Sequence, residues 1–331
     1  MPISAIKYPS INAKLKAMYS RRLKKSDLID LCKQNNLMSV IAILKNKNTN
    51  MKKLDENADR QDVEKALNYE IILDLEKIVK YLDKKDSIIF QILISKYEMN
   101  CIKKSIELIF SKNQIDDTIS VWTENIFKNL KGIEHVANLN DLMKLVENTK
   151  YKKIIEKYID ENNVNFSIFK IENELDKLYF KNIFDTANNK ELKNIIGTQI
   201  DFTNIMWIYR MKMYYNFSEE FIRSVLIDVN YRLSKNEINQ LILANNFEEL
   251  NDIIRKTKYS SIISENMFDF ECFINKYLHK AYEKMFRSNF LSINCIYAYL
   301  NLVEIENNEI ISIVESVRYN IDKSKVLKKI I

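Results

Sequence analysis

The chain has 331 residues, a formal net charge of +6, and only two glycines and two prolines. Parallel-sheet enzymes and β-barrels need tight turns built from glycine and proline, so this composition argues against both classes and favours helices joined by short polar connections. Basic and acidic residues are interspersed, whereas nucleic-acid-binding proteins usually cluster their basic residues. The length suffices for two or three domains with a sizeable buried core.

The N-terminal quarter of the chain is predicted to be helical. A proline and a serine open the first predicted helix, Tyr8–Met18. Apolar residues at helical spacing predict a second helix over Lys25–Leu44, with a break at Gln34–Asn36 as an alternative. The polar stretch Lys45–Arg60 is expected to be a loop. Further apolar stripes predict helices over Gln61–Leu82 and Ser87–Tyr97.

One stretch of the chain occurs twice. Asp141–Ile155 (DLMKLVENTKYKKII) returns 108 residues later as Glu249–Ile263 (ELNDIIRKTKYSSII). In both copies the apolar residues step by three and four, as on one face of a helix, and Thr-Lys-Tyr stands at the same phase. Any two amphipathic helices resemble each other to some degree. The identical tripeptide in phase nevertheless favours a duplicated small domain, since the period exceeds that of a solenoid repeat.

A strongly apolar helix with a polar start also recurs. Its three copies are Asp86–Tyr97, Asp201–Lys212 and Leu291–Leu302, and each follows a more polar helix. The elements return in cyclic order, so we predict an all-α protein of three similar helical lobes. The predicted lobes are residues 1–83, 84–197 and 198–331. Packed side by side, three such lobes could form a ring or funnel with approximate threefold symmetry.

The inventory of reactive residues points away from catalysis. The two histidines, His135 and His279, lack the paired spacing of a zinc site. Two isolated glycines cannot build a phosphate-binding loop, and no Gly-x-Ser-x-Gly motif occurs. We therefore expect no catalytic, cofactor-binding or metal site. The cysteines have no Cys-x-x-Cys spacing and are interpreted as buried thiols. They are Cys32, Cys101, Cys272 and Cys295.

Two further stretches bear on the class of protein. An aromatic run after residue 206 is interpreted as core packing, with base stacking as the alternative. Its members are Trp207, Tyr209, Tyr214, Tyr215 and Phe217. The longest uncharged run, Ser288–Val303, has 16 residues, fewer than the roughly 20 that a membrane-spanning helix needs. No signal peptide is recognised at Met1–Ser10. A soluble or peripheral protein is expected.

With these repeats, the chain resembles the C subunit of archaeal and bacterial V-type (A-type) ATP synthases, the counterpart of the d subunit of the eukaryotic vacuolar ATPase. The resemblance rests on the order of four motifs: Tyr8–Met18, Asp201–Glu220, the paired Thr-Lys-Tyr stretches and Ala298–Val314. In the last motif Tyr299, Glu304, Glu306 and Ile313 match the family pattern. Glu309 and Ile311 stand where Asn and Arg are usual, so a specific ion pair from that arginine is not expected.

The resemblance implies a fold and a role. Members of the family are all-helical funnels of three similar domains on the cytoplasmic end of a membrane rotor ring. The funnel receives the foot of the central axle and carries torque between axle and ring, without an active site or cofactor of its own. The implied partners are the central-axle subunits and the rotor ring, and the implied location is peripheral, on the cytoplasmic face. Neither the coupling ion, proton or sodium, nor the direction of ATP turnover is indicated.

Lysines in the repeated stretches form the candidate partner interface. They are Lys150, Lys152, Lys153, Lys256 and Lys258. The alternative interpretation is a solvated helix face. At the level of the whole protein, the alternative class is a free-standing helical adaptor or nucleic-acid-binding protein, which would explain the positive charge and the aromatics but not the order of the motifs. Strong salt-dependent binding to generic DNA or RNA would favour that class.

Overall fold

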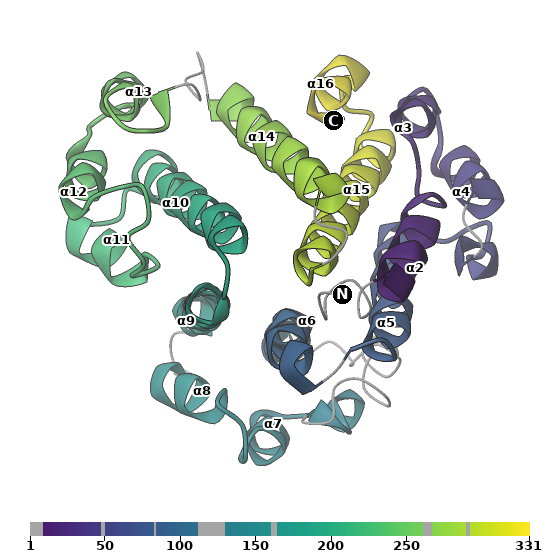
Figure 1. Ribbon diagram of the computed structural model, residues 1–331, viewed down its shortest axis with the longest axis horizontal. Helices are drawn as coiled ribbons and strands as arrows, with labels where there is room; N and C mark the ends of the chain where they lie inside the picture. The colour runs from purple at the N-terminus through teal and green to yellow at the C-terminus, as the bar shows by residue number, and fades with distance from the viewer. Residues whose placement is uncertain are drawn as a thin grey trace. The chain divides into compact units, whose positions relative to one another are not determined.

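The structure is a computed structural model that describes residues 9–47, 50–82, 84–111, 130–159, 164–260, 267–288 and 292–331. Over these ranges the regular secondary structure is helical and no strand occurs (Figure 1). The all-α prediction is therefore confirmed. The chain divides into two compact units, Met1–Asp83 with Asn275–Ile331, and Lys84–Ile274. The division into three lobes and their threefold arrangement stay predictions.

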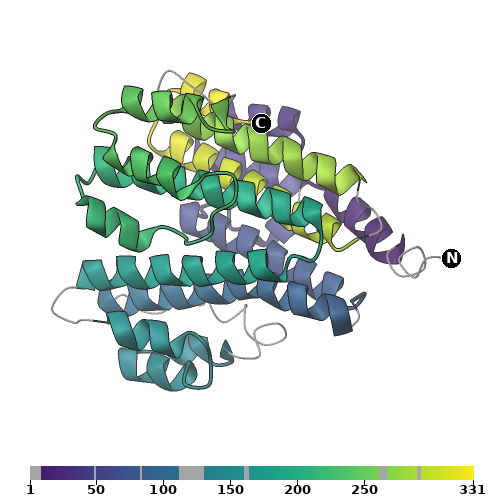
Figure 2. The same ribbon diagram turned by 60° about the vertical axis from the view of Figure 1, so that its left-hand side comes forward.

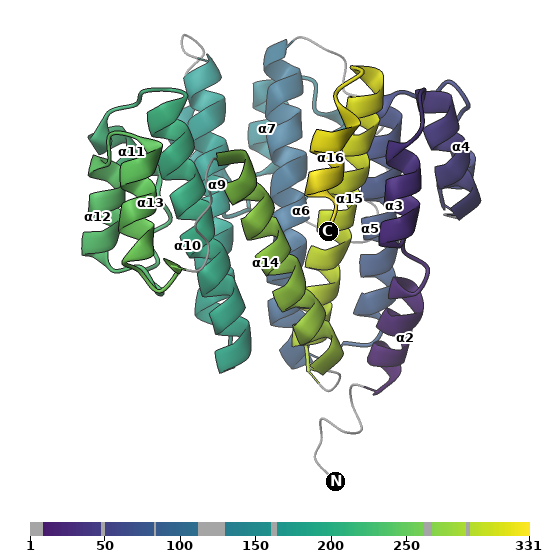
Figure 3. The same cartoon turned by 90° about the horizontal axis from the view of Figure 1, so that it is seen from above.

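The first unit joins residues from both ends of the chain around one long helix, α15 (Asn294–Arg318). Its other helices are α2 (Pro9–Tyr19), α3 (Lys25–Cys32), α4 (Leu37–Lys47), the short 3₁₀ helix η1 (Asn50–Lys53), α5 (Arg60–Val79) and α16 (Lys323–Lys329). Helix α15 packs against α2, α3, α4, α5 and α16, and Figure 3 shows it running between α5 and α16. Leu31, Val40, Leu44 and Ile313 are fully buried in the shared core. Each such burial contributes about 1.5–3 kcal/mol, so the core ties residues more than 250 positions apart into one unit.

The second unit is built on long helices with shorter ones beside them. Its elements are α6 (Lys84–Ser111), η4 (Ile133–His135), α7 (Leu139–Leu145), α8 (Lys152–Tyr158), α9 (Val164–Thr186), α10 (Lys190–Met213), α11 (Glu219–Val225), α12 (Lys235–Leu243) and α13 (Phe247–Arg255). Helices α6 and α9 run along each other (Figure 2). Helix α9 also packs against α8 and α10, and α11 and α12 lie against α10 (Figure 3). The boundary between the two units falls within α14 (Met267–Ser288).

Polar side chains begin many of these helices. An N-cap side chain accepts a hydrogen bond from a first-turn N–H that has no partner within the helix, which stabilises the helix by about 1 kcal/mol. The N-cap residues that do so are Asp59, Asn138, Asn189, Ser218, Ser234, Asn246 and Asp322. Asparagine also replaces glycine in left-handed turns, at Asn216 (φ 49°) and Asn320 (φ 50°). Asparagine therefore provides left-handed turn conformations that glycine usually provides in other proteins.

Several predicted boundaries change in the structure. The region predicted as one helix over Lys25–Leu44 contains two, α3 and α4, so the alternative with a break is correct. The loop prediction for Lys45–Arg60 is wrong in part, because α4 continues to Lys47 and η1 follows. Helix α6 extends well past the predicted end at Tyr97, since Cys101, Ile102 and Ile106 continue its buried stripe.

Candidate functional site

The repeated Thr-Lys-Tyr stretch is a turn, which corrects the prediction of a continuous helix there. Thr149 Oγ1 donates a hydrogen bond to the Val146 carbonyl at 2.7 Å and accepts one from the Tyr151 N–H at 3.2 Å. A threonine hydroxyl that bonds to nearby backbone in this way competes with the helical pattern. Helix α7 consequently ends at Leu145, and α8 begins only at Lys152.

The second copy forms the same turn after α13. Thr257 Oγ1 donates to the Ile254 carbonyl at 2.8 Å and accepts from the Tyr259 N–H at 3.1 Å. The two turns thus share their hydrogen bonds as well as their sequence, which strengthens the inference of an internal duplication. The end of the predicted repeat at residues 262–263 lies outside the described residues.

Each turn fastens its buried tyrosine to a carboxylate on a long helix of the second unit. Tyr151 donates its hydroxyl proton to Glu98 Oε2 on α6 at 2.7 Å, and Tyr259 donates to Asp201 Oδ2 on α10 at 2.6 Å. Burial and the adjacent carboxylate raise the pKa of both tyrosines well above the ordinary value. Burial also raises the pKa of Glu98 and of Asp201. Both tyrosines are therefore neutral hydrogen-bond donors at any ordinary pH.

Sequence reasoning missed both carboxylates. It aligned the apolar helices at Asp86 and Asp201, whereas the two tyrosine contacts make Glu98 the counterpart of Asp201. A usable signal existed: a tyrosine at a buried position of an amphipathic pattern needs a partner for its hydroxyl. An acidic residue within an apolar helix is a natural candidate for that partner.

Helix α10 uses the face around Asp201 to hold the extended segment between α11 and α12. Asp201 Oδ2 also accepts from the Arg232 N–H at 2.9 Å. Asn204 accepts from the Ile227 N–H at 2.9 Å and donates to the Ile227 carbonyl at 3.0 Å, so it satisfies both backbone groups of one residue. Two turns earlier, Asn194 accepts from the Tyr231 hydroxyl and from Arg232 Nη2. The turn tyrosine and this segment are therefore locked to one helix face.

Replacing Tyr259 with phenylalanine is expected to lower the free energy of unfolding by about 1–3 kcal/mol. The change removes only the hydroxyl, so Asp201 keeps its burial but loses one of its donors. Urea unfolding followed by tryptophan fluorescence, to which Trp207 on α10 contributes, would measure the loss. The same substitution at the exposed Tyr215 is the matched control and should change the value by less than about 0.5 kcal/mol. Equal effects at both positions would contradict a structural role for the tyrosine–carboxylate pair.

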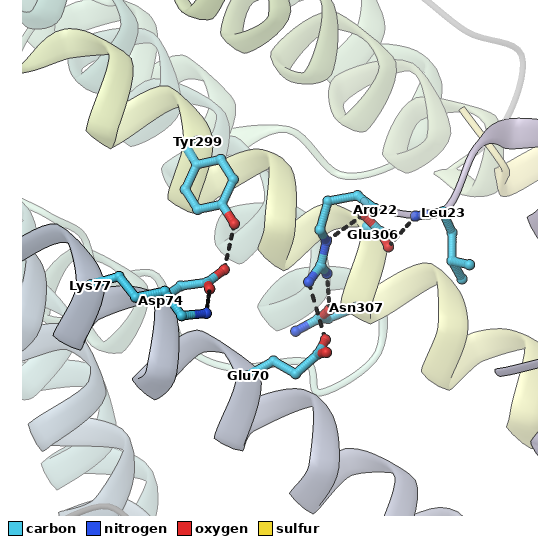
Figure 4. A network of polar contacts seen from close by, with 8 residues as sticks. All are labelled: Arg22, Leu23, Glu70, Asp74, Lys77, Tyr299, Glu306 and Asn307. Atoms are coloured by element: carbon cyan, nitrogen blue, oxygen red, sulfur yellow. Dashed lines mark hydrogen bonds and ion pairs between the residues drawn. The ribbon is translucent and has the colours of Figure 1, made fainter. Parts of the chain in front are cut away.

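The first unit contains a larger buried polar network (Figure 4). Arg22 follows α2, and its guanidinium lies between Glu306 on α15, at 2.9 Å, and Glu70 on α5, at 3.2 Å. Arg22 Nη2 also donates to Asn307 Oδ1 at 2.8 Å. Glu306 accepts a further hydrogen bond from the Leu23 N–H at 3.1 Å. The network therefore connects α5 and α15 with the segment that follows α2.

A tyrosine–carboxylate pair joins the same helices beside this network. The Tyr299 hydroxyl on α15 donates to Asp74 on α5, and Lys77 lies 2.9 Å from the other oxygen of Asp74 (Figure 4). Tyr299 and Glu306 are two of the residues that match the family pattern, and the structure gives both a buried partner. Glu309 accepts from the Ile331 N–H at 2.7 Å.

The Arg22 network is shielded from solvent. The side chains of Arg22 and Glu70 are 8% and 5% exposed. Burial by itself would lower the pKa of Arg22, but the carboxylates of Glu306 and Glu70 outweigh it and raise the pKa above the ordinary value. The arginine is therefore charged throughout the accessible pH range. Two carboxylates around one guanidinium leave a buried cluster whose stability depends on all three groups.

The candidate interface lysines lie at the Thr-Lys-Tyr turns and their flanks. Lys150, Lys153, Lys256 and Lys258 are exposed, and Lys152 is half-buried with its Nζ 3.8 Å from Glu147 Oε1. Lys150 Nζ lies 5.4 Å from the centre of the Tyr151 ring. The buried tyrosines fix the backbone that carries Lys150 and Lys258. Contact of these lysines with a partner stays a prediction.

Other sequence interpretations fare unevenly. All four cysteines are buried free thiols, as predicted. The core-packing interpretation of the aromatic run holds for Tyr209 but is wrong for Tyr214 and Tyr215, whose residues are 68% and 66% exposed. Those two follow the C-terminal end of α10, just before the left-handed turn at Asn216, so the helical spacing no longer applies.

The described part of the chain contains neither a metal-binding cluster nor a membrane-spanning helix. No group of three or more His, Cys, Asp or Glu side chains there could hold a metal ion. None of the helices in the described ranges combines the length and apolar character needed to cross a bilayer.

Comparisons with known proteins agree with the sequence resemblance. The family model for the ATP synthase (C/AC39) subunit matches residues 11–329. The chain is 21% identical to the C subunit of the A-type ATP synthase of Methanosphaera stadtmanae, over 98% of this chain and 87% of the relative. It is 21% identical to that of Pyrococcus abyssi, over 96% and 88%. It is 22% identical to that of Methanobrevibacter smithii, over 92% and 83%.

The match therefore extends over nearly the whole chain and includes both compact units. It covers the Arg22 network, both Thr-Lys-Tyr turns and α16 up to Lys329. The curated relatives share one description, the C subunit of an A-type ATP synthase. The chain belongs to the ATP synthase (C/AC39) subunit family, whose members are structural, non-catalytic subunits of the A/V-type ATP synthase.

Proposed function

We propose that this protein couples the central axle of a rotary A/V-type ATP synthase to its membrane rotor ring and transmits torque between them. It would lie on the cytoplasmic face of the membrane and serve transport of protons or sodium ions. The observation that carries the proposal is the family match across residues 11–329. The buried tyrosine–carboxylate pairs and the Arg22 network support it, because a part that carries torque must resist deformation within each unit.

These buried polar contacts are suited to that task. Tyr151, Tyr259 and Tyr299 each bond a carboxylate on another helix, and Arg22 bonds two. Directional bonds in a close-packed interior fix helices in register as well as in contact. Between such stiffened units and partners of different symmetry, polar contacts at the surface adapt better than one dry patch. The exposed lysines at the turns fit that requirement.

Co-elution tests the proposal. The purified chain would be mixed with the central-axle subunits and the detergent-solubilised rotor ring, and the mixture separated by size. A stoichiometric complex that contains both partners is the expected result. A folded helical chain that elutes apart from both would contradict the proposal. Binding to generic DNA that weakens steeply with salt would then favour the nucleic-acid-binding alternative.

Neutralising Lys150, Lys153 and Lys258 together to glutamine is expected to weaken this assembly about tenfold at moderate salt. Each exposed ion pair contributes about 0.2–1 kcal/mol, and three of them add to a factor of this order. The affinity would be measured by titrating the axle subunits at two salt concentrations. Lys104, Lys131 and Lys235, which are also exposed, supply the matched triple variant. An unchanged affinity in the first variant would remove the turn lysines from the interface.

A further inference from the structure

A separate basic surface lies at the C-terminal end of α15 and on α16. Between residues 318 and 331 the sequence has five basic residues and one acidic residue, a net +4, whereas the entire chain has a net +6. Most of the excess positive charge is therefore concentrated in fourteen residues of the sequence. The C-terminal basic patch is defined here as Arg318, Tyr319, Ile321, Lys325, Leu327 and Lys328, all of them exposed.

The backbone under the patch is held in place by the first unit. Helix α15 ends at Arg318, and the turn closes with the Ile321 N–H donating to the Ser316 carbonyl at 2.9 Å. Val326 of α16 and Ile330, which follows the helix, are buried against the core. Lys323 Nζ donates to the Lys33 carbonyl at 2.9 Å and to Asn35 Oδ1 at 2.7 Å. The patch is thus a defined surface on a docked helix.

The lysines of the patch form no ion pair with the described residues of the first unit. Among the described residues, neither Lys325 nor Lys328 is in an ion pair, and the one acidic residue, Asp322, caps α16 through Ser324. Helix α3 packs against α16. Asp30 of α3 and Lys33, which follows the helix, form an ion pair that has no net charge. The patch therefore presents a net positive charge to solvent, which the interaction of Asp322 with Lys325 and Lys328 offsets only in part.

Apolar and aromatic side chains are exposed between these charges. Tyr319 is 66% exposed, Ile321 45% and Leu327 40%. The Arg318 guanidinium lies over the Tyr319 ring, 5.4 Å from its centre. Such a mixture of lysines with single aromatic and aliphatic side chains is typical of surfaces that bind the headgroup region of a membrane, where the apolar groups insert and the lysines meet anionic lipids.

We infer that the C-terminal basic patch binds a membrane surface through anionic phospholipid headgroups. Its composition favours lipid over an acidic protein surface, because Tyr319, Ile321 and Leu327 are exposed between the charges and can insert among headgroups while the lysines attract an anionic leaflet. The inference goes beyond the coupling role, which concerns the axle and the ring. It can fail while the coupling role stands, since its test uses this chain alone.

Flotation with vesicles tests the inference. The whole chain would be mixed with phosphatidylcholine vesicles that contain about 30% phosphatidylglycerol, and with phosphatidylcholine vesicles alone. Binding is expected only to the anionic vesicles, and it should weaken as salt rises. Each lysine near an anionic surface contributes about 1 kcal/mol, so Lys325→Gln with Lys328→Gln should reduce the partition coefficient about 25-fold.

A charge-matched variant separates the patch from net charge. Lys131→Gln with Lys235→Gln removes the same charge from exposed positions of the second unit and should change binding less than twofold. Tyr319→Ser with Leu327→Ser should abolish the binding that persists at higher salt. Equal losses in the two lysine variants would overturn the inference. Failure of the wild-type protein to bind anionic vesicles would also overturn the inference. If binding to the axle or the ring then depended on Lys325 and Lys328, the patch would be assigned to an acidic protein surface instead.

Discussion

Replacing Arg22 with methionine is expected to lower the free energy of unfolding of the first unit by about 3–5 kcal/mol. Methionine keeps much of the packing volume but leaves Glu70 and Glu306 buried together without their counter-charge. Asn307 would lose the guanidinium as a donor as well. Hydrogen exchange of the α15 amides, read by mass spectrometry, measures the loss in this unit alone. Exchange there should accelerate by about a hundredfold or more.

The pH dependence identifies the cause of that loss. The pKa of Arg22 is raised in the folded state, so its contribution is complete below the ordinary arginine value and would be lost only at extreme alkaline pH. Burial raises the pKa of Glu306, and in the variant its protonation removes uncompensated buried charge, so the deficit relative to the wild type should shrink as pH falls into the acidic range. A deficit independent of pH would point to lost packing instead.

The exposed Arg255 offers the matched control for this change. Its guanidinium lies 3.0 Å from Asp252, but both side chains are about 60% exposed. An exposed pair one turn apart contributes only a few tenths of a kcal/mol. Arg255→Met should therefore leave the exchange rates of α15 and α13 within about twofold of the wild type. A loss comparable to that of Arg22→Met would show that arginine removal by itself, and not burial, sets the effect.

Composition and periodicity were enough to predict the fold class. Two glycines in 331 residues, with apolar steps of three and four, indicate helices wherever the pattern is long. The pattern fails where a side chain overrides it locally. Thr149 and Thr257 have the right phase for a helix, yet their hydroxyls accept the next tyrosine N–H and end the helical pattern. Periodicity describes which face is apolar and says nothing of such a bond.

The buried polar contacts required information that a one-dimensional pattern does not contain. Arg22 and Glu306 are 284 residues apart, and the sequence gives no reason to pair them. An arginine near the end of a short helix is usually solvated. Only the closing of α2 and α5 on α15 removes it from water and makes the carboxylates necessary. The tyrosines, by contrast, leave a signal in the sequence, because Thr-Lys-Tyr is repeated in phase with the apolar pattern.

The two Thr-Lys-Tyr stretches make the same kind of contact. In each copy a long helix supplies a carboxylate, Glu98 or Asp201, and a later turn supplies the tyrosine. The turn that follows each short helix is held by that one buried bond together with apolar packing. The exposed lysine beside each tyrosine then has a fixed backbone. For a protein proposed to carry torque, this places charged surface positions on anchored turns.

Replacing Gly197 with alanine is expected to destabilise the second unit by about 2–3 kcal/mol, although alanine is the better helix former. Gly197 lies in α10 with the Tyr231 ring directly above its backbone. A Cβ atom there would lie 2.6 Å from both Cδ1 and Cδ2 of Tyr231. The ring cannot easily withdraw, because its hydroxyl bonds Asn194 and its edge meets Phe184 at 6.2 Å between centres. Overpacking of this kind costs more than the helix propensity of alanine returns.

A double-mutant cycle with Tyr231→Ala decides whether the ring is the cause. With the ring removed, Gly197→Ala should become stabilising by about 0.5–1 kcal/mol, the ordinary gain at a helix interior. The change of sign gives a coupling energy of about 3 kcal/mol between two residues in contact. Urea unfolding followed by tryptophan fluorescence provides all four values. If Gly197→Ala destabilised the chain equally in both backgrounds, the close approach of Tyr231 to α10 would not be the reason for glycine at this position.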